Sequence, residues 1–186
     1  MTHRQAHLSI RTMLVLIFLG TGIFTQAQVT NTSFRAATGE KILRFEFVVP
    51  VNAETAWQWF TTDVKLRKWI APVTHTELRT GGYILTNYDS SKSLSDHSSI
   101  RLPIINFIEN ELLTLKVDLN ENFTQTVIDE DQNLQEIIQF KPIDSRHTKI
   151  ISSMVGWGSG TEWEKPYDFF EKGNLWTYQA LLRNFK

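Results

Sequence analysis

The chain has 186 residues, no cysteine, and 19 basic against 20 acidic residues. This length favours a single domain, and a nearly balanced charge without a basic stripe excludes the electrostatic pattern of a nucleic-acid-binding protein. Because disulfide bonds cannot form without cysteine, burial of apolar side chains must stabilise the fold.

The first 27 residues have the pattern of a secretory signal peptide. Arg4 and Arg11 precede an apolar run from Met13 to Phe24, which is followed by a small-residue cleavage pattern that ends at Ala27. The run is shorter than the roughly 20 residues that span a bilayer. We therefore expect cleavage near Ala27, a secreted or periplasmic protein, and no membrane span in the remainder. A retained N-terminal anchor is the alternative.

The domain begins after a Thr-, Asn- and Ala-rich segment, residues 28–40, which predicts a flexible leader. Residues 41–49 alternate apolar and polar side chains, which predicts a half-buried strand. Asn52 can cap a helix whose apolar side chains fall on one face. A second short helix is expected from Asp63 to Trp69.

From there the pattern changes to period two, which predicts six more strands. The expected strands are 74–79, 83–88, 100–108, 112–119, 134–140 and 149–157. Gly81 and Gly82 favour a hairpin between the first two. Residues 89–99 form a Ser-rich loop, and residues 120–133 are a polar segment with no predicted element.

Residues 161–186 predict one long C-terminal helix, because large apolar side chains recur every three or four residues. Gly173 costs about 1 kcal/mol relative to Ala inside a helix, so we interpret it as a close backbone approach or a kink. The order of elements predicts an α+β fold. In it, a curved, seven-stranded antiparallel sheet (strand, two short helices, six strands) wraps around the C-terminal helix.

Three short motifs give this order a family resemblance. They are W-x-W-F-T at 57–61, K-W-x-A-P at 68–72 and E-L-R-x-G-G at 77–82. With them, the chain resembles the START-like (SRPBCC, helix-grip) superfamily, and within it the branch named for homology to the activator of the heat-shock protein 90 ATPase. The resemblance implies a cavity between the sheet and the C-terminal helix. Members bind lipids, polyketides, hormones or unknown ligands, and a few catalyse reactions. We do not extend the branch's chaperone role to this chain, because that role needs a cytosolic partner and ATP.

The candidate cavity residues are mostly aromatic, with a few polar side chains among them. They are Trp57, Trp69, His75, Glu77, Arg79, Trp157, Tyr167, Phe170, Asn174 and Tyr178. The aromatic side chains either line a ligand cavity or fill the core. His75, Glu77 and Arg79 share one face of a strand, which is either a polar patch in the cavity or a solvated face. Asn174 is the sharpest candidate, because a polar group on an apolar helix face needs a partner.

Motifs for metals and phosphates are incomplete. The histidines lack paired spacing, so we expect no metal site and no cofactor. Gly156, Gly158 and Gly160 lack the remaining glycine of G-x-G-x-x-G, and we interpret them as flexible glycines at the corner between strand and helix.

Three functions remain open. The first is a secreted or periplasmic binding domain that holds a small hydrophobic molecule, with an apolar void that reaches solvent near the Ser-rich loop. The second is a cyclase- or hydrolase-like enzyme in the same cavity, with His75, Glu77 or Asn174 as its polar residues. The third is a protein-interaction domain with a filled core. An empty cavity of about 300 Å³ would cost about 7 kcal/mol, so a large cavity implies a ligand or selection for the open space. The sequence does not define the oligomeric state.

Overall fold

The computed structural model describes residues 28–186, so the expected signal peptide lies outside the described residues. The strands are β1 (Thr30–Asn31), β2 (Phe34–Arg35), β3 (Lys41–Val49), β4 (Val73–Glu77), β5 (Tyr83–Asn87), β6 (Ile100–Ile108), β7 (Leu112–Lys116), β8 (Gln135–Pro142) and β9 (Thr148–Val155). The helices are α1 (Ala53–Thr61), α2 (Asp63–Leu66), α3 (Gln125–Glu130) and α4 (Glu164–Arg183), with a short 3-10 turn at Thr161–Trp163 before α4.

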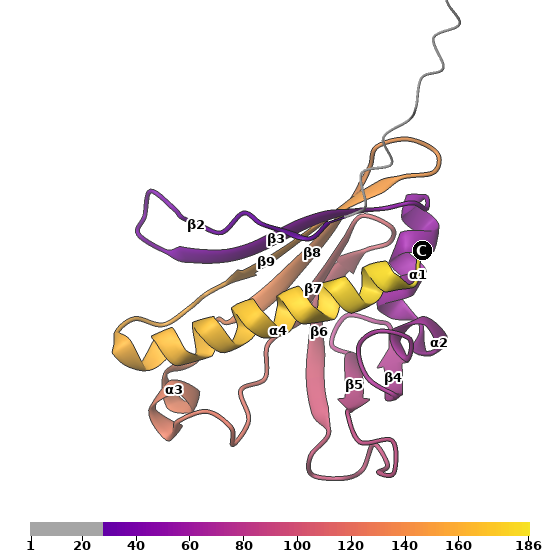
Figure 1. Ribbon diagram of the computed structural model, residues 1–186. Helices are drawn as coiled ribbons and strands as arrows, with labels where there is room; N and C mark the ends of the chain where they lie inside the picture. Colours follow the sequence, from indigo (N-terminus) through magenta and orange to yellow (C-terminus); the bar gives the residue numbers. More distant parts are fainter. Residues whose placement is uncertain (1–27) are drawn as a thin grey trace, which may run out of the picture.

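In the described part of the chain, nine strands form one antiparallel sheet in the order β1-β3-β9-β8-β7-β6-β5-β4, and β2 also pairs with β3. The sheet is curved, and α4 crosses it as a long diagonal, with α1 and α2 near the C-terminal end of that helix (Figure 1). This arrangement confirms the predicted helix-grip fold. Two short strands within the expected leader, β1 and β2, add to the seven strands predicted.

Every second side chain of β3 is buried, and these side chains face α4. Phe45 and Phe47 are buried, because side chains two residues apart lie on the same face of a strand. Their ring centroids lie 6.1 Å and 5.0 Å from that of Tyr178 on α4. The apolar face of β3 therefore packs directly against the C-terminal helix.

The first helix closes one end of the curved sheet. The side chain of Asn52 caps α1 by accepting a hydrogen bond from the backbone N–H of Thr55 at 2.9 Å, as expected. Trp57 is 4% exposed, and its ring packs edge-on against Phe140 of β8 at 5.3 Å. Helix α1 is therefore anchored on the sheet through aromatic contacts.

The polar segment before β8 contains a helix, α3, that the sequence did not predict. Only Val127 is buried in it, so no apolar period marks it. Glu130 at its end accepts a hydrogen bond from the indole N–H of Trp163 at 2.8 Å. This contact ties α3 to the beginning of α4.

Close packing, rather than flexibility alone, explains the glycine at the centre of the corner before α4. A Cβ atom at Gly158 would lie 2.1 Å from the ring of Trp163. The backbone can pass over this buried indole only because residue 158 has no side chain.

None of the helices that the structure describes is both long and apolar enough to cross a membrane.

Candidate functional site

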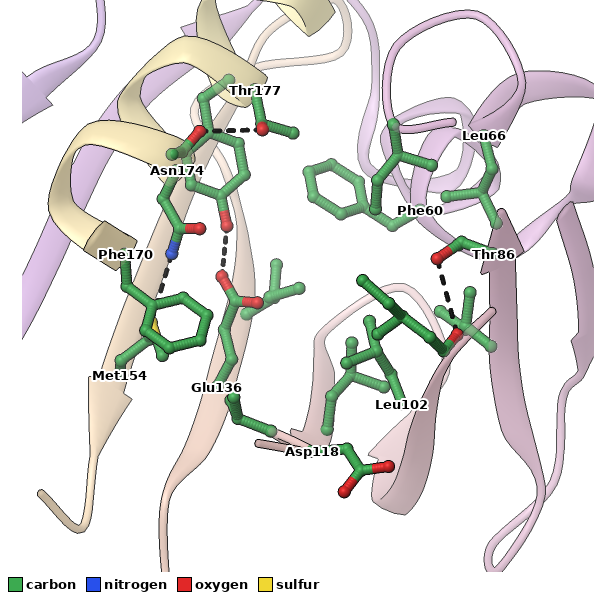
Figure 2. A pocket seen from close by; sticks show the side chains of 18 of the residues that line it. Phe60, Leu66, Thr86, Leu102, Asp118, Glu136, Met154, Phe170, Asn174 and Thr177 are labelled. Atoms are coloured by element: carbon green, nitrogen blue, oxygen red, sulfur yellow. Dashed lines mark hydrogen bonds between the residues drawn. The ribbon is translucent and has the colours of Figure 1, made fainter. Parts of the chain in front are cut away.

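A pocket of about 360 Å³ lies between α4 and the inner face of the sheet (Figure 2). Apolar side chains from several helices and strands form most of its wall. Among them are Leu66 of α2, Leu102 of β6, Leu113 of β7, Ile138 of β8 and Phe170 of α4. An apolar wall with a few convergent polar groups is typical of small-molecule sites.

The pocket reaches solvent near the Ser-rich loop. Tyr88, which directly precedes this loop, and Phe169 of α4 both line the pocket, and both are more than half exposed. Asn120 and Asn122 contribute polar side chains to the wall. A molecule could therefore enter between the end of β5, the segment that follows β7, and α4.

A carboxyl group lies inside the pocket. Glu136 of β8 is two residues from Ile138, so both side chains face the pocket. Its Oε1 atom accepts a hydrogen bond from Ser152 Oγ on β9 at 2.6 Å and a second one from the phenol of Tyr178 on α4. Figure 2 shows the side chain of Glu136 reaching from the sheet into the space beneath the helix. The pair of Glu136 and Tyr178 connects the two halves of the grip.

Burial raises the pKa of Glu136 above 4.5, while the hydroxyl groups of Ser152 and Tyr178 partly oppose this shift by donating hydrogen bonds to the carboxylate. Burial also raises the pKa of Tyr178 well above its ordinary value, and the negative charge of Glu136 adds to that effect. Tyr178 therefore remains a neutral donor. The carboxyl group is the titratable group of the pair.

Asn174 of α4 also faces the pocket. Its side-chain N–H group donates to the sulfur of Met154 on β9 at 3.2 Å, and a thioether is a weak acceptor. Within the described residues, no hydrogen bond reaches the carbonyl oxygen of Asn174, which points toward the pocket in Figure 2. This residue can therefore accept a hydrogen bond from a bound molecule.

The structure brings four of the predicted residues into the pocket wall: Trp69, Phe170, Asn174 and Tyr178. Trp57 lies outside it and fills the core between α1 and the sheet. Trp157 and Tyr167 also lie outside this wall, and their rings pack against each other with centroids 4.9 Å apart.

The expectation of a polar patch in the cavity is wrong for β4. His75 and Arg79 are exposed and Glu77 is half-buried, and none of the three lines the pocket. Arg79 instead pairs with Glu77 at 2.7 Å. The buried face of this strand carries Thr74, which is 1% exposed, so the odd-numbered residues point away from it. This is the solvated strand face that the sequence left open as the alternative.

Glu136 was missed in the sequence analysis, although a signal was present. It lies two residues from both Leu134 and Ile138, so it shares the face of the predicted strand 134–140 that carries these two apolar residues. An ionisable residue at an inward position of such a strand indicates a buried polar site.

Several solved structures resemble this fold, although their sequences differ from this chain. No protein-family model matches the chain, and no curated protein matches it. Among solved structures, the conserved protein of unknown function EF2215 from Enterococcus faecalis superposes with a TM-score of 0.60 at 14% identity, covering 83% of this chain and 75% of the other. The Aha1 dimer from Colwellia psychrerythraea gives a TM-score of 0.56 at 15% identity, covering 77% and 92%. CalU16 from Micromonospora echinospora gives 0.55 at 11% identity, covering 83% and 81%.

These identities are low, so the likeness establishes the fold alone. The chain has a helix-grip fold, and the Aha1 dimer from Colwellia psychrerythraea is among the structures that share this fold. The resemblance predicted from the three tryptophan- and glycine-containing motifs is thereby confirmed at the level of the fold.

Proposed function

We propose that the protein is a binding domain that holds a small, mainly hydrophobic molecule between its sheet and α4. The observation that carries the proposal is the pocket of about 360 Å³, which has an apolar wall and a polar centre at Glu136. Any part of such a space that stays empty costs about 24 cal/mol per Å³. A ligand that fills the space removes this cost, whereas a filled core, the third function considered above, would have no such pocket.

Gly173 supports the proposal independently. It lines the pocket from the middle of α4, where a Cβ atom would meet no other atom within 4 Å. The glycine is therefore not required by close packing against the sheet. Its presence keeps space open beneath the helix, although Gly is about 1 kcal/mol less favourable than Ala inside a helix.

The test combines native mass spectrometry with two variants at this position. Protein purified from its own source should retain a bound small molecule, and it should also bind the neutral dye Nile red. Gly173→Leu places a side chain in the pocket and should abolish both, whereas the matched control Gly173→Ala should keep most of the binding. Thermal unfolding confirms that both variants fold. A wild-type protein without bound mass, together with equal dye binding by wild type and Gly173→Leu, would refute the proposal.

An enzyme in the same pocket is a second candidate, and one observation favours it. Glu136 is a carboxyl group with a raised pKa in a pocket, a property of general acids. The retained molecule can decide between the two functions. An enzyme would convert it on incubation to a product that differs in mass or in chromatographic retention, and Glu136→Gln would stop the conversion, whereas a binding domain would release it unchanged.

We further propose that the mature protein is secreted or periplasmic. Support comes from the sequence of residues 1–27, with its two arginines, apolar run and small-residue ending at Ala27. Determination of the N-terminal sequence of the protein from its own source tests this location. A mature chain that begins near Gln28 is expected, and a chain that retains Met13 to Phe24 would contradict it.

A further inference from the structure

We propose, on the basis of the binding function above, that the ligand is an organic amine. Its ammonium group would pair with Glu136, and its apolar body would fill the space between α4 and the sheet.

The charges of the pocket wall favour a cation. Among the described residues that line the pocket, Glu136 and Asp118 are acidic, and none is Lys, Arg or His. Asp118 follows β7 and is exposed to solvent. An anionic ligand would bring its charge into an apolar space without a partner, which is strongly unfavourable. A cation meets a carboxyl group at the centre of the pocket and another in its wall.

At the centre of the pocket, two acceptor atoms receive no hydrogen bond from the described residues. Oε1 of Glu136 already accepts hydrogen bonds from Ser152 and Tyr178, so the hydroxyl hydrogens of these two residues are in use. The hydroxyl of Thr177 donates to the carbonyl of Gly173 at 2.8 Å. Within the described chain, no hydrogen bond reaches Oε2 of Glu136 or the side-chain oxygen of Asn174.

An ammonium group matches this pattern because it has three hydrogen-bond donors and no acceptor. One N–H group can bind Oε2 of Glu136, and another can bind the side-chain oxygen of Asn174. A hydroxyl group has a single hydrogen to donate, so it can satisfy only one of these two acceptors. A carboxylate brings acceptors only.

Aromatic side chains add a second element of recognition. Trp69, Phe170 and Tyr178 line the same pocket as Glu136, and the faces of aromatic rings attract cations. The other ionisable groups in this wall are the phenols of Tyr88 and Tyr178 and the carboxyl of Asp118. None of them is a cation that could compete with the ligand for Glu136.

Three probes with a phenyl group on a four-carbon chain test the inference: phenylbutylamine, phenylbutanol and phenylbutyrate. Their affinities for the full protein are measured by isothermal titration calorimetry at mildly alkaline pH, where the amine is still protonated and carboxyl groups ionise. A charge-assisted hydrogen bond should make the amine bind about 10- to 100-fold more tightly than the alcohol. Phenylbutyrate should bind most weakly.

Matched variants locate the source of the selectivity. Glu136→Gln keeps the size of the side chain and should lower amine affinity to about that of the alcohol. Glu77→Gln makes the same chemical change on β4, outside the pocket, and should leave all three affinities unchanged. Asn174→Leu should weaken the amine more than the alcohol, which keeps the test valid if Glu136→Gln does not fold.

The outcomes separate this inference from the proposed function. If the alcohol or the carboxylate binds wild type as tightly as the amine, the inference is refuted while the binding function stands. The same holds if Glu136→Gln folds and keeps the preference for the amine. If none of the three probes binds, the inference fails, and the binding function is judged separately by native mass spectrometry and Nile red binding.

Discussion

Replacing Gly173 by Ala should stabilise the protein, although the residue lies on the face of α4 that lines the pocket. Gly inside a helix is about 0.8–1.0 kcal/mol less favourable than Ala. A Cβ atom at this position would meet no other atom within 4 Å, so no steric clash opposes the gain. We expect the free energy of unfolding to rise by about 1 kcal/mol, which raises Tm by about 2–4 °C in a domain of this size.

The same substitution at Gly158 should have the opposite sign. A Cβ atom there would lie 2.1 Å from the ring of Trp163. That indole is 3% exposed and donates a hydrogen bond to Glu130 at 2.8 Å, so it cannot move without losing contacts. Overpacking of this kind costs about 1–3 kcal/mol.

Urea unfolding monitored by circular dichroism measures both changes, on protein freed of bound ligand because ligand binding also raises apparent stability. The denaturant dependence of the unfolding free energy should stay constant, so that the midpoints alone report stability. If Gly173→Ala unfolds at or below the wild-type midpoint, the space beneath Gly173 is not free, and its support for a ligand is lost.

Two further predictions concern the core and the buried carboxyl group. The free energy of unfolding should fall as pH rises from 4.5 through the raised pKa of folded Glu136, because in this range the folded state keeps a proton that the unfolded state has released. Urea titrations at several pH values measure this dependence, which Glu136→Gln should remove. The assignment would be contradicted if the unfolding free energies of wild type and Glu136→Gln depended equally on pH. Phe140→Ala should cost about 3–5 kcal/mol, because the ring is 1% exposed and packs against Trp57 and Phe60 at 5.3 Å and 5.2 Å. Ile143→Ala, at a side chain that is 57% exposed, should change stability by less than about 0.5 kcal/mol, and similar losses in the two variants by thermal unfolding would contradict the placement of Phe140.

The fold could be predicted because its signals are local. Strands β3 and β6 begin and end at the predicted residues, since uninterrupted alternation and the turn residues around them mark both ends. The aromatic stripe marks α4, which covers Glu164–Arg183 after a 3-10 turn. Helix α3 escaped prediction because it buries only Val127 and lacks the apolar period of a packed helix.

The site was less predictable, because it depends on how distant strands align. Tyr178 and Asn174 were found through their position on the stripe of α4. Glu136 is recognisable as a site residue only from its contacts with Ser152 and Tyr178. Ser152 lies on β9 opposite Ile138 of β8, and Tyr178 lies 42 residues further along the chain than Glu136. Such pairings follow from register and docking, which no local pattern specifies.

The two shortest strands have a consequence for how copies of this protein behave toward one another. Strands β1 and β2 pair with β3 along its outer side, from Thr30 opposite Glu46 to Arg35 opposite Lys41. They shield the backbone N–H and C=O groups of a nine-residue strand, and they are themselves too short to be a good template for another chain. A chain shortened to begin at Lys41 would leave that edge bare and should self-associate through added strands.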